Sequence, residues 1–391
     1  MPSHLNQPKK LRILQVLPSL FSGGVERSTL DLCRYLVDQG HEAWVVSAGG
    51  PLVEALEIAG AIHVTLPVHS KNPLTMWKNS FALIKLHQQQ SFDIIHARSR
   101  APAWSCYWAS KKICIPFVTT FHGQYGHQNS FKKMYNGVML KGDVCIAVSE
   151  FIASHITEIY PQHKTKIKLI REGIDLVSFS HNSPSVSISD LKAHWAIDNN
   201  HTVIILPGRL TRIKGHQIFL EALSQLKDAS ISCLIVGDET GKDHYQKELQ
   251  EFIAAHQLSS IVKFTGNYYD MPAMYALADI VISASIKPES FGLIACEAQA
   301  MGCLVVATKH GGSLETIAPC QKQFMCEIKD SLTMAQAIKH AIDYCDINNQ
   351  NLKQKIQIES REYIEQNFSL ERMCQETLSL YTSLMLNHGS D

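Results

Sequence analysis

The sequence predicts an α/β protein made of two doubly wound units in series, each a parallel sheet covered by helices on both faces. Three observations predict this class. The chain has 391 residues, which is too long for one ordinary domain and suits two. Short apolar runs alternate with helical patterns in both halves, and residues 175–190, rich in Ser, Asn and Pro, separate the halves. We expect domains at 1–178 and 179–371, with a final helix at about 372–391.

The first half contains six apolar runs of four to eight residues, the length of buried strands. A helical pattern at 25–39 joins the first two runs. Strands that alternate with helices in this way form a parallel sheet. The expected strands are residues 11–18, 42–47, 61–66, 94–97, 117–120 and 145–148.

The second half repeats the alternation with five apolar runs. A helix at 293–301 follows the fourth run, and residues 368–388 again have apolar residues at helical spacing. Ligands of doubly wound sheets bind beyond the carboxyl ends of the strands, so the residues after each run are candidates for a site. The expected strands are residues 203–207, 233–236, 262–265, 280–285 and 304–307.

Composition indicates a soluble globular protein, with 45% hydrophobic and 18% charged residues. No stretch approaches the roughly 20 apolar residues that span a bilayer. The first ten residues lack the apolar core of a signal peptide, so we expect a cytoplasmic protein. Eleven cysteines without a Cys-x-x-Cys pair indicate reduced thiols rather than disulfides or zinc ligands.

Charge is distributed unevenly, although the net charge is zero. Residues 1–170 contain 18 Lys/Arg and 10 Asp/Glu, whereas the remainder contains 18 and 26. The basic half suggests an anionic partner such as a membrane surface, and ordinary solvated lysines are the alternative. The candidate lysines are Lys9, Lys10, Lys111, Lys112, Lys132, Lys133 and Lys141.

The segment Pro-Glu-Ser-Phe-Gly-Leu-Ile-Ala-Cys-Glu suits a nucleotide sugar. It places Glu289 in the loop before a helix and Glu297 about two turns farther on, along the flank of that helix. One carboxylate can accept hydrogen bonds from sugar hydroxyls and the other from ribose hydroxyls. The helix N-terminus can hold a diphosphate through the amide groups of Phe291, Gly292 and Leu293. The alternative is an acidic first turn favoured by the helix dipole alone.

The order of elements around this segment closely resembles the donor site of family 4 (group 1) retaining glycosyltransferases of the GT-B fold. The matching elements are a strand, Pro-Glu-x-Phe-Gly, a helix of small residues, Met-Gly, a further strand at 304–307 and a His310-Gly-Gly turn. The resemblance implies two Rossmann-like domains that face each other across a cleft. The first lies on the acceptor side and receives the C-terminal helix, and the second binds the nucleotide sugar. The resemblance implies a catalytic role for Glu289, which binds the sugar hydroxyls of the donor. It implies that Glu297 binds the ribose of the donor.

Two further loops match the donor site of this family. In the loop at 208–215, Arg209 and Lys214 match a clamp for the diphosphate. Arg presents a planar fork to phosphate oxygens and Lys adds a point charge, so the clamp can work without a metal ion. Gly23 and Gly24 open the first helix and meet the donor phosphates in the family, although by themselves they also fit a tight turn.

Other residues at strand ends have candidate roles. His122, in Thr-Phe-His-Gly, matches the histidine that the family places beside the donor sugar and is the second catalytic candidate. Gly237 and Tyr268 follow strands near the expected nucleotide base, and Glu172 stands where the family usually has Asn. The acceptor candidates follow strands of the basic half and are Arg98, Arg100 and Gln124. Packing or helix capping is the alternative for each.

The resemblance implies a retaining, metal-independent hexosyltransferase with no cofactor and a nucleotide diphosphate sugar, a UDP-sugar, as co-substrate. The sequence contains no Asp-x-Asp and no His/Cys cluster with metal spacing. The chain also resembles bacterial envelope and lipopolysaccharide glycosyltransferases in three elements, Pro-Gly-Arg-Leu-Thr, Asp-Met-Pro-Ala and Glu-Ala-Gln-Ala-Met-Gly. Together with the basic first half, this resemblance implies a glycolipid or polysaccharide acceptor and peripheral contact with the anionic cytoplasmic face of the inner membrane. No basic stripe interleaved with aromatics is evident, so we expect no nucleic-acid partner. The alternatives are a nucleotide-sugar 2-epimerase of the same fold and a non-catalytic nucleotide-sugar-binding subunit; the oligomeric state stays open.

Overall fold

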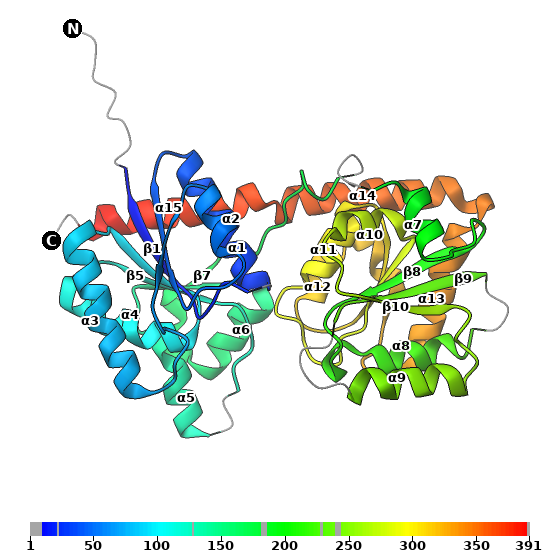
Figure 1. Cartoon of the computed structure of the whole chain (residues 1–391), viewed down its shortest axis with the longest axis horizontal. Coiled ribbons are helices and arrows are strands. Elements are labelled where there is room, and N and C mark those ends of the chain that lie inside the picture. The colour runs from blue at the N-terminus through cyan, green and yellow to red at the C-terminus, as the bar shows by residue number, and fades with distance from the viewer. Residues whose placement is uncertain are drawn as a thin grey trace, which may run out of the picture. The chain divides into compact units, whose positions relative to one another are not determined.

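The chain forms two compact α/β units in a computed structural model that describes residues 10–21, 23–126, 129–180, 186–226, 230–238 and 244–388 (Figure 1). Unit 1 comprises Met1–Gly173 and Leu370–Asp391, and unit 2 comprises Ile174–Ser369. Each unit contains a parallel sheet with helices packed on both faces, which confirms the predicted doubly wound class. Lys9 and residues 181–185 of the Ser-rich segment lie outside the described residues.

The sheet of unit 1 has seven parallel strands in the order β3-β2-β1-β4-β5-β6-β7. The chain runs outward from β1 to β3 and then returns to the other side of β1, so the order reverses between β1 and β4. Doubly wound sheets bind their ligands at the carboxyl ends of the strands beside such a reversal. The strands are β1 Arg12–Val16, β2 Glu42–Ser47, β3 Ile62–Thr65, β4 Ile94–Ala97, β5 Phe117–Phe121, β6 Val144–Ala147 and β7 Ile167–Leu169.

Helices cover both faces of this sheet because successive side chains of a strand point to opposite faces. Leu14 and Val16 of β1 enter one apolar core, whereas Ile13 enters the other. The helices are α1 Gly24–Asp38, α2 Val53–Ile58, α3 Pro73–Gln90, α4 Arg100–Ile113, α5 Ser130–Asn136, α6 Glu150–Ile159 and α15 Leu370–His388, with the short 3₁₀ helices η1 Gly137–Leu140 and η2 Pro161–Lys166.

The C-terminal helix α15 packs within unit 1. Met373 and Tyr381 of this helix enter the same core as Ile13. The Tyr381 hydroxyl lies 2.6 Å from Nδ1 of His96, and Nε2 of His96 lies 2.7 Å from Oγ1 of Thr120. These side chains are buried, and the two hydrogen bonds give each of their polar groups a partner. The same hydrogen bonds attach α15 to β4 and β5.

The sheet of unit 2 has six parallel strands in the order β10-β9-β8-β11-β12-β13. The order reverses between β8 and β11, as it does between β1 and β4 in unit 1. The strands are β8 Thr202–Pro207, β9 Ile231–Val236, β10 Val262–Gly266, β11 Ile280–Ser283, β12 Leu304–Thr308 and β13 Met325–Cys326.

Two apolar cores also flank the sheet of unit 2. Ile204 and Leu206 of β8 enter one core, and Val203 and Ile205 enter the other. The helices are α7 Ile188–His194, α8 His216–Leu223, α9 His244–Ala255, α10 Met271–Leu277, α11 Leu293–Ala300, α12 Ser313–Thr316, α13 Ser331–Cys345 and α14 Gln350–Phe368, with the 3₁₀ helices η3 Arg212–Lys214, η4 Pro319–Phe324 and η5 Ile347–Asn349.

The structure contains two edge strands that the apolar pattern did not predict. The three-residue β7 has an exposed lysine at its centre, and β13 has only two residues. Both strands lie at a sheet edge, where natural strands are often short and charged. The predicted strand at 280–285 was too long, because β11 ends at Ser283.

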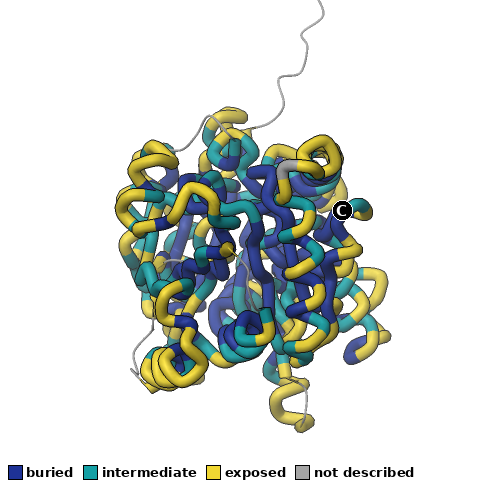
Figure 2. Tube along the Cα trace, turned by 90° about the vertical axis from the view of Figure 1, so that its right-hand side faces the viewer, coloured by how far each residue is buried: buried dark blue, intermediate teal, exposed yellow. Residues whose placement is uncertain are grey.

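Burial follows the layers of each unit. Figure 2 shows the strands mainly in dark blue and the outer faces of the helices in yellow. No helix in the described ranges is long and apolar enough to cross a membrane. All eleven cysteines are free thiols, and most of them are buried.

Candidate active site

The candidate residues of unit 2 lie in the loops at the carboxyl ends of its central strands. The loop after β8 contains Arg209 and Lys214, and the loop after β11 contains Glu289. Because β8 and β11 are neighbours at the reversal of strand order, these two loops lie next to each other at the carboxyl ends of the strands. The position is the one where doubly wound sheets bind ligands.

An ion pair between Lys214 and Glu289 connects these two loops. Nζ of Lys214 lies 2.7 Å from Oε1 of Glu289, and the two side chains are 22% and 25% exposed. The Ser285 hydroxyl donates a second hydrogen bond to the same oxygen. Burial raises the pKa of Glu289, but the Lys214 ammonium and the Ser285 hydroxyl outweigh it and hold that pKa below its ordinary value. The carboxylate is therefore ionised and held in one orientation.

Close backbone packing fixes the loop that contains Glu289. Gly312 donates its N–H to the carbonyl of Glu289 over 2.8 Å. Gly311 has a φ of +60°, and a Cβ at this position would lie 2.5 Å from the same carbonyl oxygen. A larger residue would therefore displace the loop. The Gly-Gly turn after β12 thus helps to determine where Glu289 stands.

Helix α11 begins directly after this loop. Gly292, its N-cap residue, has a φ of 106°, and no side chain of the described residues caps the helix. The uncapped N-terminus favours an anion near the predicted amides of Phe291, Gly292 and Leu293. The Phe291 ring faces the core, with its centroid 5.3 Å from that of Phe368, so only its backbone can serve a ligand.

Glu297 lies on α11, and the Tyr275 hydroxyl donates a hydrogen bond to its Oε2 over 2.8 Å. Burial and the nearby carboxylate raise the pKa of Tyr275, so the phenol stays protonated and acts as the donor.

Among the predicted base contacts, Gly237 needs to be glycine because a Cβ would lie 2.1 Å from the carbonyl oxygen of Gly208. Tyr268 packs partly against the core.

The two predicted clamp cations have different surroundings. Lys214 is held by Glu289, whereas Arg209 is exposed. Arg212, between them in sequence, pairs with Glu248 over 2.6 Å. Within the described part of the chain, the Arg209 guanidinium forms no ion pair, and it can therefore turn toward a phosphate without breaking one.

In unit 1, His122 is paired with a carboxylate. Its Nδ1 lies 3.3 Å from Oε2 of Glu172, and the two side chains are 9% and 7% exposed. Burial lowers the pKa of His122 more than Glu172 raises it, so the ring is neutral at pH 7. Burial raises the pKa of Glu172, but His122 and Arg98 outweigh it, so Glu172 is ionised.

The pairing determines which nitrogen of His122 carries the proton. A neutral ring beside a carboxylate keeps its proton on the nitrogen that faces the carboxylate, here Nδ1. Nε2 then carries a lone pair, and it has no hydrogen-bond partner among the described residues. His122 can therefore accept a hydrogen bond through Nε2.

The three acceptor candidates occupy different environments in unit 1. Arg98 is 4% exposed and donates a hydrogen bond to the Ser28 hydroxyl over 2.8 Å. Arg100 is half-buried, with its guanidinium 4.0 Å from the ring centroid of Tyr125, and Gln124 is exposed. A ligand can reach Gln124 directly, because its side chain is exposed. Arg98 is buried, and its charge lowers the pKa of Glu172.

Gly23 and Gly24 lie exposed at the start of α1. A Cβ at Gly23 would lie 2.3 Å from Oε2 of Glu26, so this carboxylate covers the loop. A phosphate bound at the N-terminus of α1 would be repelled by the carboxylate, and Glu26 would have to turn away.

Among the described residues, no group of three His, Cys, Asp or Glu side chains could hold a metal ion.

Sequence reasoning missed three contacts of these sites. It did not single out Ser285 or Tyr275, and it noted Glu172 only as a departure from a family pattern. Ser285 is the last residue of the predicted strand 280–285, and a polar residue at the carboxyl end of a strand was the available signal. The Glu172–His122 contact joins residues 50 positions apart and gives no local signal.

Comparisons with known proteins cover nearly the whole chain. Residues 22–178 match the family model "Glycosyltransferase Family 4", and residues 187–359 match "Glycosyl transferases group 1". A crystal structure of a glycosyltransferase from Rickettsia africae ESF-5 is 37% identical, with a TM-score of 0.88 over 96% of this chain and 99% of that chain. Anabaena HepE in complex with UDP and glucose is 24% identical, with a TM-score of 0.82 over 95% and 100%. The N-acetyl-alpha-D-glucosaminyl L-malate synthase of Bacillus anthracis is 24% identical over 96% of this chain and 98% of its own.

Proposed function

The chain belongs to the group 1 glycosyltransferases of family 4, with the GT-B fold, and from this premise we propose that it transfers a sugar from a UDP-sugar to a hydroxyl of an envelope glycolipid or polysaccharide, with retention of anomeric configuration. The observation that carries the proposal is the Lys214–Glu289 pair beside the uncapped N-terminus of α11. HepE, of the same fold, binds UDP and UDP-glucose, which supports a UDP-sugar as the donor.

The donor diphosphate is bound by two cations and a helix N-terminus. Lys214, held in place by Glu289, presents its remaining N–H groups to a phosphate oxygen, and Arg209 turns in from the surface. The amides before α11 add uncharged donors, and the loop at Gly24 adds further donors once Glu26 has turned away from it. These groups bind the diphosphate more strongly as its charge grows in the transition state, which contributes on the order of several kcal/mol.

The two carboxylates hold the rest of the donor. Glu289 accepts hydrogen bonds from sugar hydroxyls through the oxygen that faces away from Lys214. Glu297, oriented by Tyr275, accepts hydrogen bonds from the ribose hydroxyls. Glu289 acts as an ionised acceptor, because its pKa is held below its ordinary value.

The reaction exchanges one glycosidic bond for another at the anomeric carbon. The bond from that carbon to the β-phosphate oxygen breaks, and the acceptor hydroxyl attacks from the face that the leaving group vacates. A β-phosphate oxygen takes the hydroxyl proton, so the products are UDP and the glycoside. This route requires no protein side chain as a base.

His122 contributes by binding rather than by proton transfer. Its Nε2 lone pair accepts a hydrogen bond from a hydroxyl of the donor sugar, and Glu172 is the positioning residue that holds the proton on Nδ1. The contact with His122 and the charge of the buried Arg98 together hold the pKa of Glu172 below its ordinary value. An acceptor at Gln124 and Arg100 would lie on the same loop region of unit 1.

Product analysis tests this proposal. The protein is incubated with UDP-, GDP- and ADP-sugars and a lipid extract, with EDTA present, and the product's anomeric configuration is determined by NMR. The proposal predicts UDP release coupled to a retained glycoside. Conversion of the UDP-sugar without any acceptor would indicate a 2-epimerase, and binding without turnover would indicate a non-catalytic subunit.

A further inference from the structure

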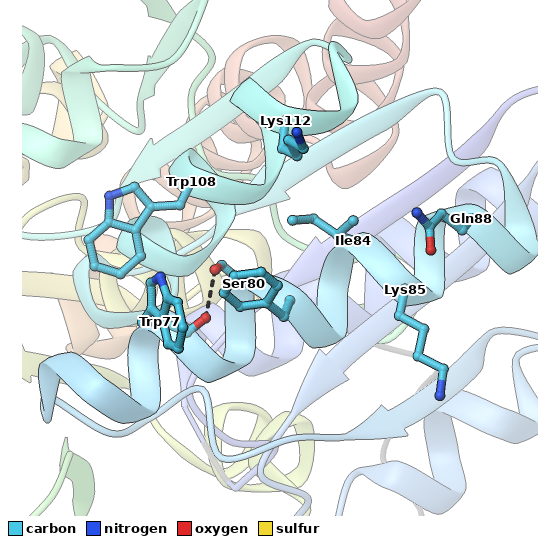
Figure 3. A pocket seen from close by; sticks show the side chains of 8 residues that line it. Trp77, Ser80, Ile84, Lys85, Gln88, Trp108 and Lys112 are labelled. Carbon is cyan, nitrogen blue, oxygen red and sulfur yellow. Dashed lines mark hydrogen bonds between the residues drawn. The ribbon is translucent and has the colours of Figure 1, made fainter.

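Helices α3 and α4 of unit 1 form a groove whose walls are aromatic. Trp77 and Phe81 of α3 are 54% and 52% exposed, and their rings meet edge to face with centroids 4.5 Å apart. Trp108 of α4 lines the same groove. Figure 3 shows the two indole rings toward one end of the groove and Lys85 and Lys112 farther along it.

The aromatic side chains of α3 are not needed for its packing in the core. The buried face of α3 consists of Met76, Asn79, Ser80 and Leu83. Trp77, Phe81 and Ile84 recur at intervals of four and three residues, which places them on one other face of the helix. Single exposed apolar residues are common, but a contiguous aromatic patch marks a contact surface.

The charge around the groove identifies the kind of partner. Residues 58–142, which include α3, α4 and α5, contain ten Lys/Arg and a single acidic residue, Asp93. This segment accounts for the whole positive excess of the first half of the chain. No carboxylate of the described residues pairs with Lys85 or Lys112, so their charge is presented to solvent.

We propose that this α3–α4 surface, made of Trp77, Phe81, Ile84, Trp108, Lys85 and Lys112, docks unit 1 on the surface of an anionic lipid bilayer. Tryptophan side chains favour the bilayer–water interface, and lysines are attracted to anionic head groups. A second copy of the chain fits less well, because a symmetric contact would place these lysines against each other.

Helix α5 also presents exposed apolar and basic side chains next to the α3–α4 surface. Trp104 connects α4 to α5, because its Nε1 donates to the carbonyl of Tyr135 over 3.2 Å and its ring lies 5.7 Å from that of Trp108. On α5 the exposed apolar side chains of Phe131 and Met134 flank two exposed lysines, Lys132 and Lys133. The proposal rests on the proposed function in one respect, because docking brings unit 1 to a membrane-bound acceptor.

Vesicle sedimentation tests the surface independently of catalysis. The full chain is mixed with vesicles of phosphatidylcholine alone or with 30% phosphatidylglycerol, at low and high salt. We expect binding only to the anionic vesicles, and loss of binding at high salt because screening weakens the attraction. The double variant Lys85→Gln/Lys112→Gln should lower the partition coefficient about 30-fold, from the effect of two surface lysines. Trp77→Ala/Phe81→Ala should lower it by a similar factor.

Matched variants on unit 2 serve as controls. Lys247→Gln/Lys355→Gln removes two exposed lysines, and Leu352→Ala removes an apolar side chain with the same 52% exposure as Phe81. These controls should bind vesicles like the wild type. Thermal unfolding of every variant checks that the fold is retained.

Several outcomes would overturn the proposal. These are equal binding to neutral vesicles, binding that the α3–α4 variants leave unchanged, and absence of vesicle binding. Preferential binding of a single-stranded oligonucleotide, or self-association abolished by Trp77→Ala/Phe81→Ala, would assign the surface to another partner. Turnover with a detergent-dispersed acceptor is measured separately: vesicle binding without any transfer would reject the proposed function alone, and transfer without vesicle binding would reject the docking surface alone.

Discussion

Replacing Lys214 by Met tests the ion pair at the centre of the candidate donor site. Met retains most of the length of the side chain but removes the ammonium group. Glu289 then keeps the hydrogen bond from Ser285 and loses the one from Lys214. A half-buried carboxylate would remain without its cation, so both folding and diphosphate binding should weaken.

The magnitude follows from the burial of the pair. Breaking a fully buried ion pair costs about 3–5 kcal/mol, whereas an exposed pair contributes at most about 1 kcal/mol. With 22% and 25% exposure, the Lys214–Glu289 pair is between these limits, and we expect Lys214→Met to lower the free energy of unfolding by about 2 kcal/mol. Loss of one charge-assisted hydrogen bond to phosphate should raise the Kd for UDP roughly 10- to 150-fold.

The assay is a double-mutant cycle with Glu289→Gln, measured by urea unfolding. Because the two side chains are in direct contact, we expect a coupling energy of about 1–2 kcal/mol. Lys214→Arg is the control, since it keeps the charge. The ordinary pKa of Glu289 is 4.5 and the folded pKa is lower, so the pair stabilises the fold above pH 4.5 and loses this effect as the pH falls through the folded value. Lys214→Met should weaken that pH dependence.

Two results together would refute this reasoning. A coupling energy below about 0.3 kcal/mol would mean that the pair does not act as a unit. An unchanged Kd for UDP in Lys214→Met would mean that Lys214 does not contact the diphosphate. Either result alone would remove the corresponding half of its assignment.

Three further substitutions and one control substitution have defined outcomes. Glu289→Ala should reduce transfer at least about 100-fold while calorimetry still detects UDP binding, and near-normal turnover would reject the role of this carboxylate. Glu172→Gln removes a group that raises the pKa of His122, so an acid limb of kcat/KM caused by protonation of His122 should move to lower pH; a purely structural role would change stability and leave the limb in place. Gly215→Ala should lower the free energy of unfolding by more than about 2 kcal/mol, because φ is +75° and a backbone oxygen lies 1.9 Å from the new Cβ. Gly266→Ala, at a φ of +67° with nothing within 4 Å, should cost only about 1–2 kcal/mol, and equal losses would contradict the clash.

The fold was largely predictable because apolar runs alternate with helical patterns in both halves of the chain. Each predicted strand corresponds to a strand of one of the two sheets. The pattern failed at β7 and β13, where an edge position makes a long apolar run unnecessary. It also overextended the strand at 280–285, because Ser285 lies in the loop although its neighbours are apolar.

The candidate site was predictable only in part. The sequence indicates which residues follow strands, and the loops that contain Arg209, Lys214 and Glu289 do lie at neighbouring strand ends. Periodicity does not show where a side chain points after its strand has ended. Arg98 was predicted to meet the acceptor from a loop, yet its guanidinium lies in the interior near Glu172, and its role stays a prediction.

Donor binding coupled to transfer is the measurement that tests the central claim most directly. Calorimetric titration with UDP-, GDP- and ADP-sugars should give binding of one sugar nucleotide that Arg209→Ala and Lys214→Met both weaken. The same nucleotide should then be consumed, with retention, when a lipid extract is added. Absence of binding across the panel, or binding that both variants leave unchanged, would contradict the account of the donor site.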